Sequence, residues 1–327
     1  CAYILTGSIR KGIKTVRVNA SLVDLRDGKN LWADRFDHPI QDILALQDKI
    51  TRQIVAALSV QLTASESSQL SQSARLNEDA YDTLLHGLVF LHRFSAQDNA
   101  AARDKFQAAA SMDPQYARAY ANIALTHARD VVWFGAEDRE RSIVLAHQAA
   151  DKAQALDKNL TQIYFARGVI ALAQKNYQQA IDAARFAVSV NTNYADAYAL
   201  LANAYLLNGD AQSALTAIES AKKLNPKYPF SYLGVQGHAL FLSGDYDTAL
   251  TVLSESLDRN PTFMTARILI VAIRGHVGQL EEASWDIAEL LSTRPDFSLA
   301  TARTESLYRR TEDLDKLLGG LRKAGLD

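Results

Sequence analysis

Two consecutive stretches of 34 residues decide the fold: TQIYFARGVIALAQKNYQQAIDAARFAVSVNTNY at 161–194 and ADAYALLANAYLLNGDAQSALTAIESAKKLNPKY at 195–228. Small and large side chains fall at the same places in both stretches. The matched pairs are Tyr164 with Tyr198, Gly168 with Ala202, Ala171 with Tyr205, Ala180 with Ala214, Ala184 with Ile218, and Ala187 with Ala221. A fixed period of this length indicates one structural unit used repeatedly.

The matched residues predict two antiparallel helices in each stretch. Helices cross closely only where both contribute small side chains, so we expect Gly168 to face Ala180 and Ala202 to face Ala214. Residues 208–210, Asn-Gly-Asp, supply a turn because Gly and Asn tolerate positive φ. One such hairpin cannot bury its own apolar face, so the units must stack. The alternative, an ordinary helical bundle with accidental alanine periodicity, is disfavoured because the pattern continues in both directions.

A helix–turn–helix unit of 34 residues resembles the tetratricopeptide repeat (TPR). Similar units precede and follow the central pair, with longer gaps in the first two and an apolar insert at Val131–Gly135. This insert is predicted to extend both helices or to form a loop that packs on a neighbouring surface. The predicted fold is therefore mostly α: a TPR α-solenoid of about six helical hairpins over residues 80–297. Capping helices over residues 298–327 follow, predicted at Leu299–Tyr308 and Asp313–Ala324.

Residues 1–62 have a different pattern. Tyr3–Ile9, Thr15–Asp24 and Asn30–Phe36 are predicted strands, and a helix is predicted from Asp42 to Leu58. Three strands and one helix make a thin core, so we expect an upstream segment to complete it. The absence of an initial methionine likewise suggests a fragment.

This N-terminal region resembles the second half of a TolB-like α/β domain. The resemblance rests on YILTGSIRK (3–11), VRVNASLVD (16–24), LWADRFD (31–37) and DILALQDKI (42–50). Residues 1–62 are thus predicted as a partial TolB-like α/β domain, and the Ser- and Gln-rich residues 63–79 as a linker. In bacteria such domains commonly precede TPR arrays. The resemblance implies an upstream effector domain, either a class III adenylate/guanylate cyclase or a winged-helix transcription regulator.

Composition limits the class of protein. Of 327 residues, 48% are apolar and 22% are charged, which fits a globular chain. A formal net charge of −2 gives no general attraction to nucleic acid. Cys1 is the single cysteine, which rules out an intramolecular disulfide and a cysteine-based metal cluster. No apolar run is long enough to span a membrane. We expect a cytoplasmic protein, with the periplasm as the alternative if a membrane helix precedes Cys1.

No catalytic constellation stands out. The sequence lacks a P-loop, a nucleophile elbow, a zinc-protease motif and a dinucleotide fingerprint. His86 and His92 are six residues apart and do not share a helix face, whereas His238 and His276 fall on first helices of adjacent units and can approach each other. We therefore expect no enzyme activity, no cofactor and no metal in this chain.

The predicted function is a non-catalytic protein-interaction and regulatory scaffold, in which the inner groove of the array binds a protein partner or an own-chain segment. The alternatives are the regulatory C-terminal part of a class III nucleotide cyclase and that of a transcriptional regulator. The predicted groove residues are Phe165, Val169, Leu172, Leu200, Asn203, Leu206, Leu207, Val235, His238, Phe241, Leu242, Ile268 and Leu269.

An exposed apolar strip of that length requires a cover. The candidates are a partner's amphipathic helix, the Val131–Phe134 insert, the C-terminal helices, or a tighter superhelix that closes the groove on itself. A second copy of the chain, docked on the N-terminal strand edge, is a further possible partner.

Overall fold

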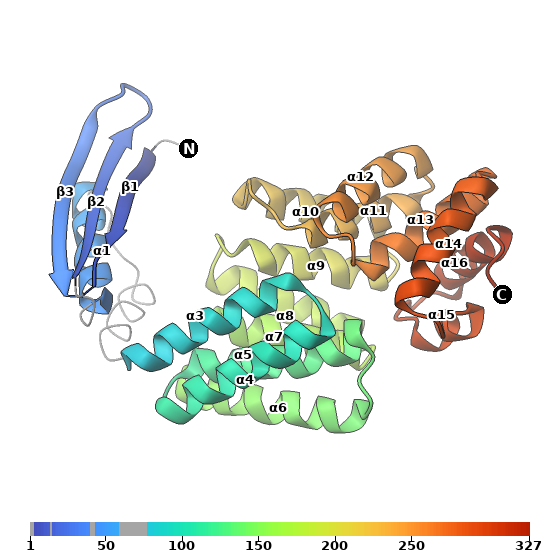
Figure 1. Cartoon of the computed structure of the whole chain (residues 1–327), viewed down its shortest axis with the longest axis horizontal. Coiled ribbons are helices and arrows are strands. Elements are labelled where there is room, and N and C mark those ends of the chain that lie inside the picture. Colours follow the sequence, from blue (N-terminus) through green and yellow to red (C-terminus); the bar gives the residue numbers. More distant parts are fainter. Residues whose placement is uncertain (1–2, 14, 40–42, 59–76) are drawn as a thin grey trace. The chain divides into compact units, whose positions relative to one another are not determined.

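A computed structural model of the chain describes residues 3–13, 15–39, 43–58 and 77–327. The chain forms two compact units, Cys1–Leu85 with Ser111–Pro114, and His86–Ala110 with Gln115–Asp327. The first unit contains a small sheet and the second contains most of the helices (Figure 1). Most of the predicted linker, residues 63–79, lies outside the described residues, as do Cys1 and Asp42.

The described residues up to Leu58 form a three-stranded antiparallel meander and helix α1. The elements are β1 Tyr3–Lys11, β2 Thr15–Asp24, β3 Asn30–Pro39 and α1 Ile43–Leu58, and the sheet order is β1-β2-β3. Val16 of β2, Phe36 of β3 and Leu46 of α1 form the buried core, with Trp32 and Ile50 packed against it. These elements match the strands and helix predicted from the alternating pattern.

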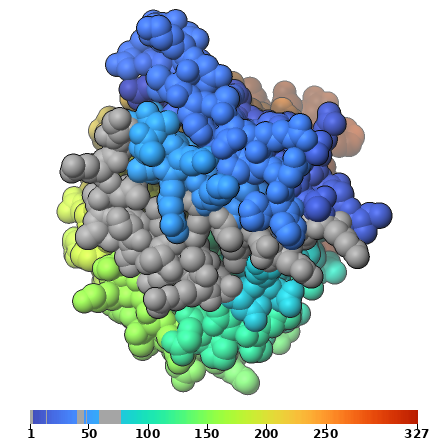
Figure 2. Space-filling model, turned by 90° about the vertical axis from the view of Figure 1, so that its left-hand side faces the viewer, coloured from blue at the N-terminus to red at the C-terminus, as the bar shows by residue number. Residues whose placement is uncertain are grey.

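Strand β1 is an edge strand in the described part of the chain. It pairs with β2 along Tyr3–Lys11, and α1 packs against β3. Leu5 and Ile9 of β1 are accordingly 52% and 73% exposed. Figure 2 shows the surface of this unit in shades of blue. An open edge offers unpaired backbone groups to another strand. We therefore still predict that the chain self-associates through β1.

Six successive helical hairpins, α3 to α14, follow in the described residues, as predicted. Their bounds are α3 Glu78–Arg93, α4 Ala96–Met112, α5 Ala117–Arg129, α6 Arg139–Leu156, α7 Thr161–Ala173, α8 Tyr177–Val190, α9 Ala195–Leu207, α10 Ala211–Leu224, α11 Phe230–Ser243, α12 Tyr246–Arg259, α13 Met264–Val277 and α14 Leu280–Thr293. From α5 onward, each first helix packs on its own second helix and on the first helix of the next hairpin (Figure 1).

Small residues lie at the helix crossings, as the period predicted. Ala180, Ala202 and Ala214 are fully buried. A Cβ atom built on Gly168 would lie 2.6 Å from Leu200 Cδ2 of the next hairpin and 3.5 Å from the Ala180 carbonyl oxygen. These positions therefore exclude larger side chains, because a core at this packing density has no room to spare.

Each hairpin turn contains one residue with positive φ. These residues are Phe94 (φ 59°), Gly135 (69°), Lys175 (58°), Gly209 (92°), Gly244 (87°) and Gly278 (79°). Glycine is the residue that adopts this conformation without steric cost, and four of the six turns use it. Phe94 and Lys175 are the exceptions, and a non-glycine residue in this region is strained.

The array ends in a short helix and a longer one. Helix α15 spans Leu299–Glu305 and α16 spans Thr311–Lys323. Helix α15 stops short of the predicted end at Tyr308, because the backbone turns extended at Ser306 (ψ 134°). Helices α13 and α16 cross at Gly275 and Gly320, where a Cβ on Gly275 would lie 2.0 Å from the Gly320 carbonyl oxygen. In the described ranges, no helix combines the length and the apolar character needed to cross a membrane.

Candidate functional site

The predicted groove residues lie on the first helices of the third to sixth hairpins, and none of them is exposed. Seven are buried: Val169, Leu172, Leu200, Leu206, Leu207, Phe241 and Leu269. Six are half-buried: Phe165, Asn203, Val235, His238, Leu242 and Ile268. They therefore do not form an open apolar strip in this structure.

Some of these residues pack between hairpins. Leu200 fits against Gly168 of the preceding hairpin, and Val235 packs on the cluster that joins α9, α10 and α11. Leu206 belongs to a second cluster between α9, α10 and α11. Phe241 belongs to the core that includes α13 and α16. A partner can reach Leu206 and Phe241, which are fully buried, only if their cover moves.

Three aromatic residues from the first two hairpins cluster together, and one of them, Phe94, meets the fifth and sixth hairpins. Phe94, Trp133 and Phe134 are here called the plug. The ring of Phe94 lies 5.6 Å from that of Trp133 and 5.4 Å from that of Phe134. It also lies 5.7 Å from Phe230 at the start of α11 and 5.6 Å from Phe263 before α13. The aromatic insert predicted at Val131–Gly135 therefore packs against the array's own surface.

The insert takes the form of a π-helix, η2 Asp130–Phe134, that continues α5. Arg129, the last residue of α5, is buried with its guanidinium 4.4 Å from the centre of the Phe94 ring. It donates a hydrogen bond to the Leu91 carbonyl oxygen near the end of α3. Burial lowers the pKa of Arg129 to about 10, although the nearby Asp130 and Asp196 carboxylates oppose this effect. The side chain thus stays charged at neutral pH and contributes a cation–π contact to the plug.

A second own-chain segment lies against the ends of α9 and α11. Residues Ser306–Arg310, here called the strap, connect α15 to α16. The Arg309 amide donates to the Leu207 carbonyl oxygen at 2.9 Å, and the Arg309 guanidinium donates to Asn208 Oδ1 at 2.7 Å. The Tyr177 hydroxyl donates to the Leu307 carbonyl oxygen at 2.9 Å. The strap therefore binds the array by main-chain hydrogen bonds as well as by side chains.

Tyr308 is the aromatic anchor of the strap. Its hydroxyl hydrogen-bonds with His238 Nε2 of α11, and the two rings meet edge to face at 5.3 Å. Burial lowers the pKa of His238 to about 3, so the imidazole is neutral at pH 7. His276 instead hydrogen-bonds the Lys316 carbonyl oxygen, and Phe241 lies near both imidazoles.

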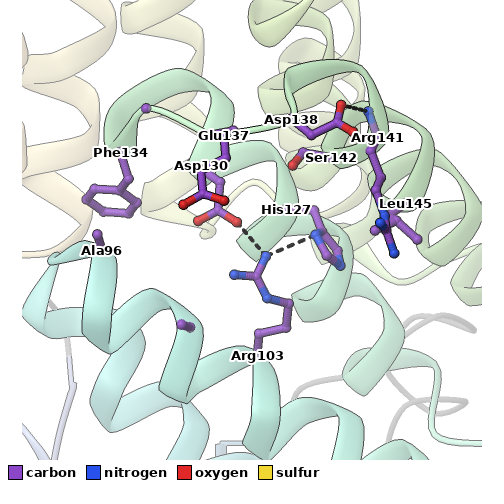
Figure 3. Close-up of a pocket in the computed structure, with 13 residues that line it drawn as sticks. Ala96, Arg103, His127, Asp130, Phe134, Glu137, Asp138, Arg141, Ser142 and Leu145 are labelled. Carbon is purple, nitrogen blue, oxygen red and sulfur yellow. Dashed lines mark hydrogen bonds and ion pairs between the residues drawn. The ribbon is translucent and has the colours of Figure 1, made fainter.

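A separate hollow of about 430 Å³ lies between α4, α5, η2 and the start of α6 (Figure 3). Arg103 of α4 extends into it and donates to Asp130 Oδ2 at 2.5 Å and to His127 Nδ1 at 2.9 Å. Asn99, which lies on α4 like Arg103, donates to the Asp130 carboxylate at 2.7 Å. Asp138 begins α6 at the rim, where its carboxylate accepts from the Arg141 amide.

This network leaves His127 unsuited to act as a base. An arginine can only donate, so Nδ1 is the accepting nitrogen and Nε2 carries the proton. Burial first, and then the Arg103 charge, lower the pKa of His127 to about 4, against the opposing effect of Asp130. The lone pair a general base would use is thus already engaged. Within the described ranges, no cluster of His, Cys, Asp and Glu could hold a metal ion.

Sequence reasoning missed the plug residue Phe94, the strap and the hollow around Arg103. Phe94 had a local signal, because it occupies the turn position where four other hairpins have glycine. Tyr308 had none, since the hydrogen bond and the ring contact that anchor it join it to His238, 70 positions away. His127 and Asp130 are three residues apart on the continuous helix α5–η2, but Arg103 becomes their neighbour only when α4 packs on α5.

The comparisons with known proteins agree with this architecture. A tetratricopeptide-repeat family model matches residues 171–235. A chain of the crystallised APC/C hetero-tetramer Cut9–Hcn1 superposes with a TM-score of 0.54 at 17% identity, over 82% of this chain and 54% of that one. The helical unit has the TPR fold. A thermophilic TPR protein of Thermus thermophilus aligns over 59% of this chain and 98% of its own, at 17% identity and a TM-score of 0.48.

A curated relative matches part of the TPR-containing chain. Over 153 residues, 46% of this chain, the sequence is 34% identical to "Putative adenylate cyclase 3" of Rhizobium meliloti (strain 1021). The chain spans 26% of the length of that protein.

Proposed function

We propose that this chain is a non-catalytic interaction scaffold whose TPR array binds an extended segment, from a protein partner or from its own chain, along the first helices of its hairpins. One observation carries the proposal: an own-chain segment already lies against two first helices, at the C-terminal end of α9 and at His238 of α11. The strap binds through the Arg309 amide and the Leu207 carbonyl oxygen and buries part of Tyr308 against His238. Peptide recognition by backbone hydrogen bonds and one anchoring side chain is a common mode of binding.

Site-specific photocrosslinking tests the partner. A photoreactive phenylalanine analogue is placed at the half-buried Asn203 or Phe165 on the predicted groove face, and at the exposed Phe186 of α8 as the control. The expected result is one discrete crosslinked protein from the groove positions and not from the control. That protein, once purified, should bind the chain saturably, and Asn203→Trp should abolish the binding. Equal crosslinking at Phe186, or binding unaffected by Asn203→Trp, would contradict the proposal.

The absence of catalysis is tested separately. The purified chain is incubated with ATP or GTP and Mg²⁺ or Mn²⁺, and cyclic nucleotide is measured. We expect no product above a heat-killed control, because cyclisation requires acidic metal ligands in a fold of their own. Product above the control would overturn the scaffold interpretation.

A second proposal is narrower: the chain is the regulatory part of a class III adenylate cyclase. The 34% identity to the Rhizobium meliloti protein supports it. It would keep the chain in the cytoplasm, where ATP is available. The coding sequence on either side of these residues is the test. A cyclase catalytic domain there supports the proposal, and a winged-helix domain in its place would reject it.

A further inference from the structure

Four first helices of the array share one electrostatic feature at their C-terminal ends. A basic side chain donates to a terminal or near-terminal carbonyl oxygen of α3, α7 and α11, and to a carbonyl oxygen in the turn that follows α9. The pairs are Arg129 with Leu91, Arg139 with Ala173, Arg310 with Gly209, and Lys316 with Leu242. Helix C-termini carry unpaired carbonyl groups and a partial negative charge, so each pair satisfies an acceptor and complements the helix dipole.

The four basic residues come from two sources. Arg129 and Arg139 belong to α5 and α6 and lie inside the array. Arg310 and Lys316 come from the strap and from α16, and reach α9 and α11 across sequence separations of 101 and 74 residues. The acceptors of α9 and α11 are thus paired by a segment that joins the array late in the chain.

The strap is bound by main-chain and side-chain contacts, as a peptide ligand would be. Arg309 and Arg310 are exposed, and Leu307 and Tyr308 are half-buried. The hydrogen bond from the Arg309 amide to the Leu207 carbonyl oxygen is a main-chain contact that any residue except proline can make at that position. Specificity comes from the aromatic ring on His238 and from the basic groups at Asn208 and Gly209.

We propose that the strap is an exchangeable internal ligand of the TPR array, and that the partner of this surface is a peptide segment with an aromatic residue followed by two arginines. Such a segment makes the same contacts with α9 and α11 once the strap is released. The proposal rests on the proposed scaffold function and specifies both its partner chemistry and its regulation.

Hydrogen exchange on the wild-type chain is the first test. If the strap opens by itself, the Arg309 amide should exchange about 100-fold faster than amides in the middle of α9 and α11, because local opening requires less free energy than global unfolding. An excess of a synthetic peptide of residues 304–312, TESLYRRTE, should speed deuterium uptake in the strap further by holding the array in its open form. Exchange of Arg309 at the rate of the α9 interior, unchanged by the peptide, would overturn the proposal.

Peptide binding to the full chain is the second test. The triple variant Tyr308→Ser, Arg309→Ser, Arg310→Ser removes the strap's three side-chain anchors, keeps only its main-chain contacts, and changes no residue of the hairpins. Fluorescence anisotropy should show the labelled TESLYRRTE peptide binding this variant about tenfold or more tightly than wild type, because no internal ligand competes. The matched control is Arg322→Ser, Lys323→Ser at the end of α16, which removes two exposed cations without touching the strap and should behave as wild type.

The peptide with serine at its tyrosine and both arginines serves as the ligand control and should not bind. If the triple variant folds cooperatively but does not bind the TESLYRRTE peptide, the proposal is contradicted. If the triple variant does not fold, the exchange measurement on wild type decides. Failure of the scaffold function would give a different result. If the peptide exchanges with the strap but no cellular protein crosslinks, the strap remains an internal ligand and the proposal of a protein partner is rejected.

Discussion

The plug and the strap cover two parts of the same array by different physical means. In the plug, the ring of Phe94 packs against four others, and Arg129 lies over its face. In the strap, one half-buried tyrosine and a few hydrogen bonds hold five residues, and both arginines stay exposed. Aromatic burial is worth several kcal/mol, whereas net hydrogen bonds contribute about 1 kcal/mol each. All three plug residues are half-buried, as Tyr308 is, so the two covers differ in the number of rings in contact and not in burial. We expect the strap, which has fewer ring contacts, to release more easily.

Truncation of one aromatic residue at each contact, Phe263 on the array side of the plug and Tyr308 in the strap, should separate the two covers most clearly. Phe263→Ala removes a buried ring that contacts Phe94 and Phe230, and we expect a loss of about 3–5 kcal/mol in the free energy of unfolding. Tyr308→Ala in the strap should cost about 1–2 kcal/mol, measured by urea denaturation. Trp285→Ala is the control: Trp285 is 73% exposed, so stability should change by less than about 0.5 kcal/mol. Equal losses of stability in the Phe263 and Tyr308 variants would show that the two covers do not differ in how strongly they are held.

Acid should weaken the strap's anchor. The pKa of His238 is lowered from 6.5 to about 3, so the unfolded state binds a proton at a higher pH than the folded state. The stability from neutral His238 is then complete above about pH 6.5 and is lost as the pH falls toward 3, a decrease of a few kcal/mol. His127 contributes in the same direction as the pH falls from 6.5 toward 4.

Melting temperatures measured from pH 7 to pH 4 check this expectation. His238→Gln in a His127→Gln background should flatten the profile relative to the His127→Gln parent. The plug contains no histidine, so Phe94→Ala should lower the whole profile without changing its slope. If the melting temperature of the His238→Gln variant depends on pH as steeply as that of its parent, the assignment of a neutral imidazole to the half-buried His238 is contradicted.

Backbone strain in the plug predicts a smaller effect. Phe94 has φ of 59°, where glycine is unstrained and alanine is not. Both Phe94→Ala and Phe94→Gly lose the ring contacts, but the glycine variant should be about 1 kcal/mol more stable than the alanine variant. Chemical denaturation of the pair measures this difference. The reverse order would mean that the turn relaxes when the ring is removed.

The smallest effect is expected at Lys175, the other strained turn residue, which belongs to neither cover. Its φ is 58°, so Lys175→Gly should raise stability by about 0.5–1 kcal/mol. The matched control is Lys152→Gly on the exposed face of α6, where glycine should cost about 1 kcal/mol because it weakens a helix interior. Opposite signs for the two substitutions would show that the conformation of the turn, and not the loss of lysine, produces the gain.

The sequence by itself determined the repeated unit. A period of 34 residues with small side chains at fixed places suffices to predict the hairpins, and the burial of Ala180, Ala202 and Ala214 follows from those places. The glycine turns and the three strands are also local properties, since φ preference and alternation act over a few residues. The predicted groove residues lie on the expected helices because the repeat register fixes them.

Only the tertiary structure decided what covers those helices. Contact between Phe94 and Phe263, or between Tyr308 and His238, depends on small rotations between units that accumulate along the array, and the repeat period does not encode them. The helix predicted to reach Tyr308 ends at Glu305. The Arg309 amide does not continue that helix but donates to the carbonyl oxygen of Leu207 in α9. Local propensity is weak compared with such long-range contacts, so the sequence predicts the array and the packed chain decides which of its faces are covered.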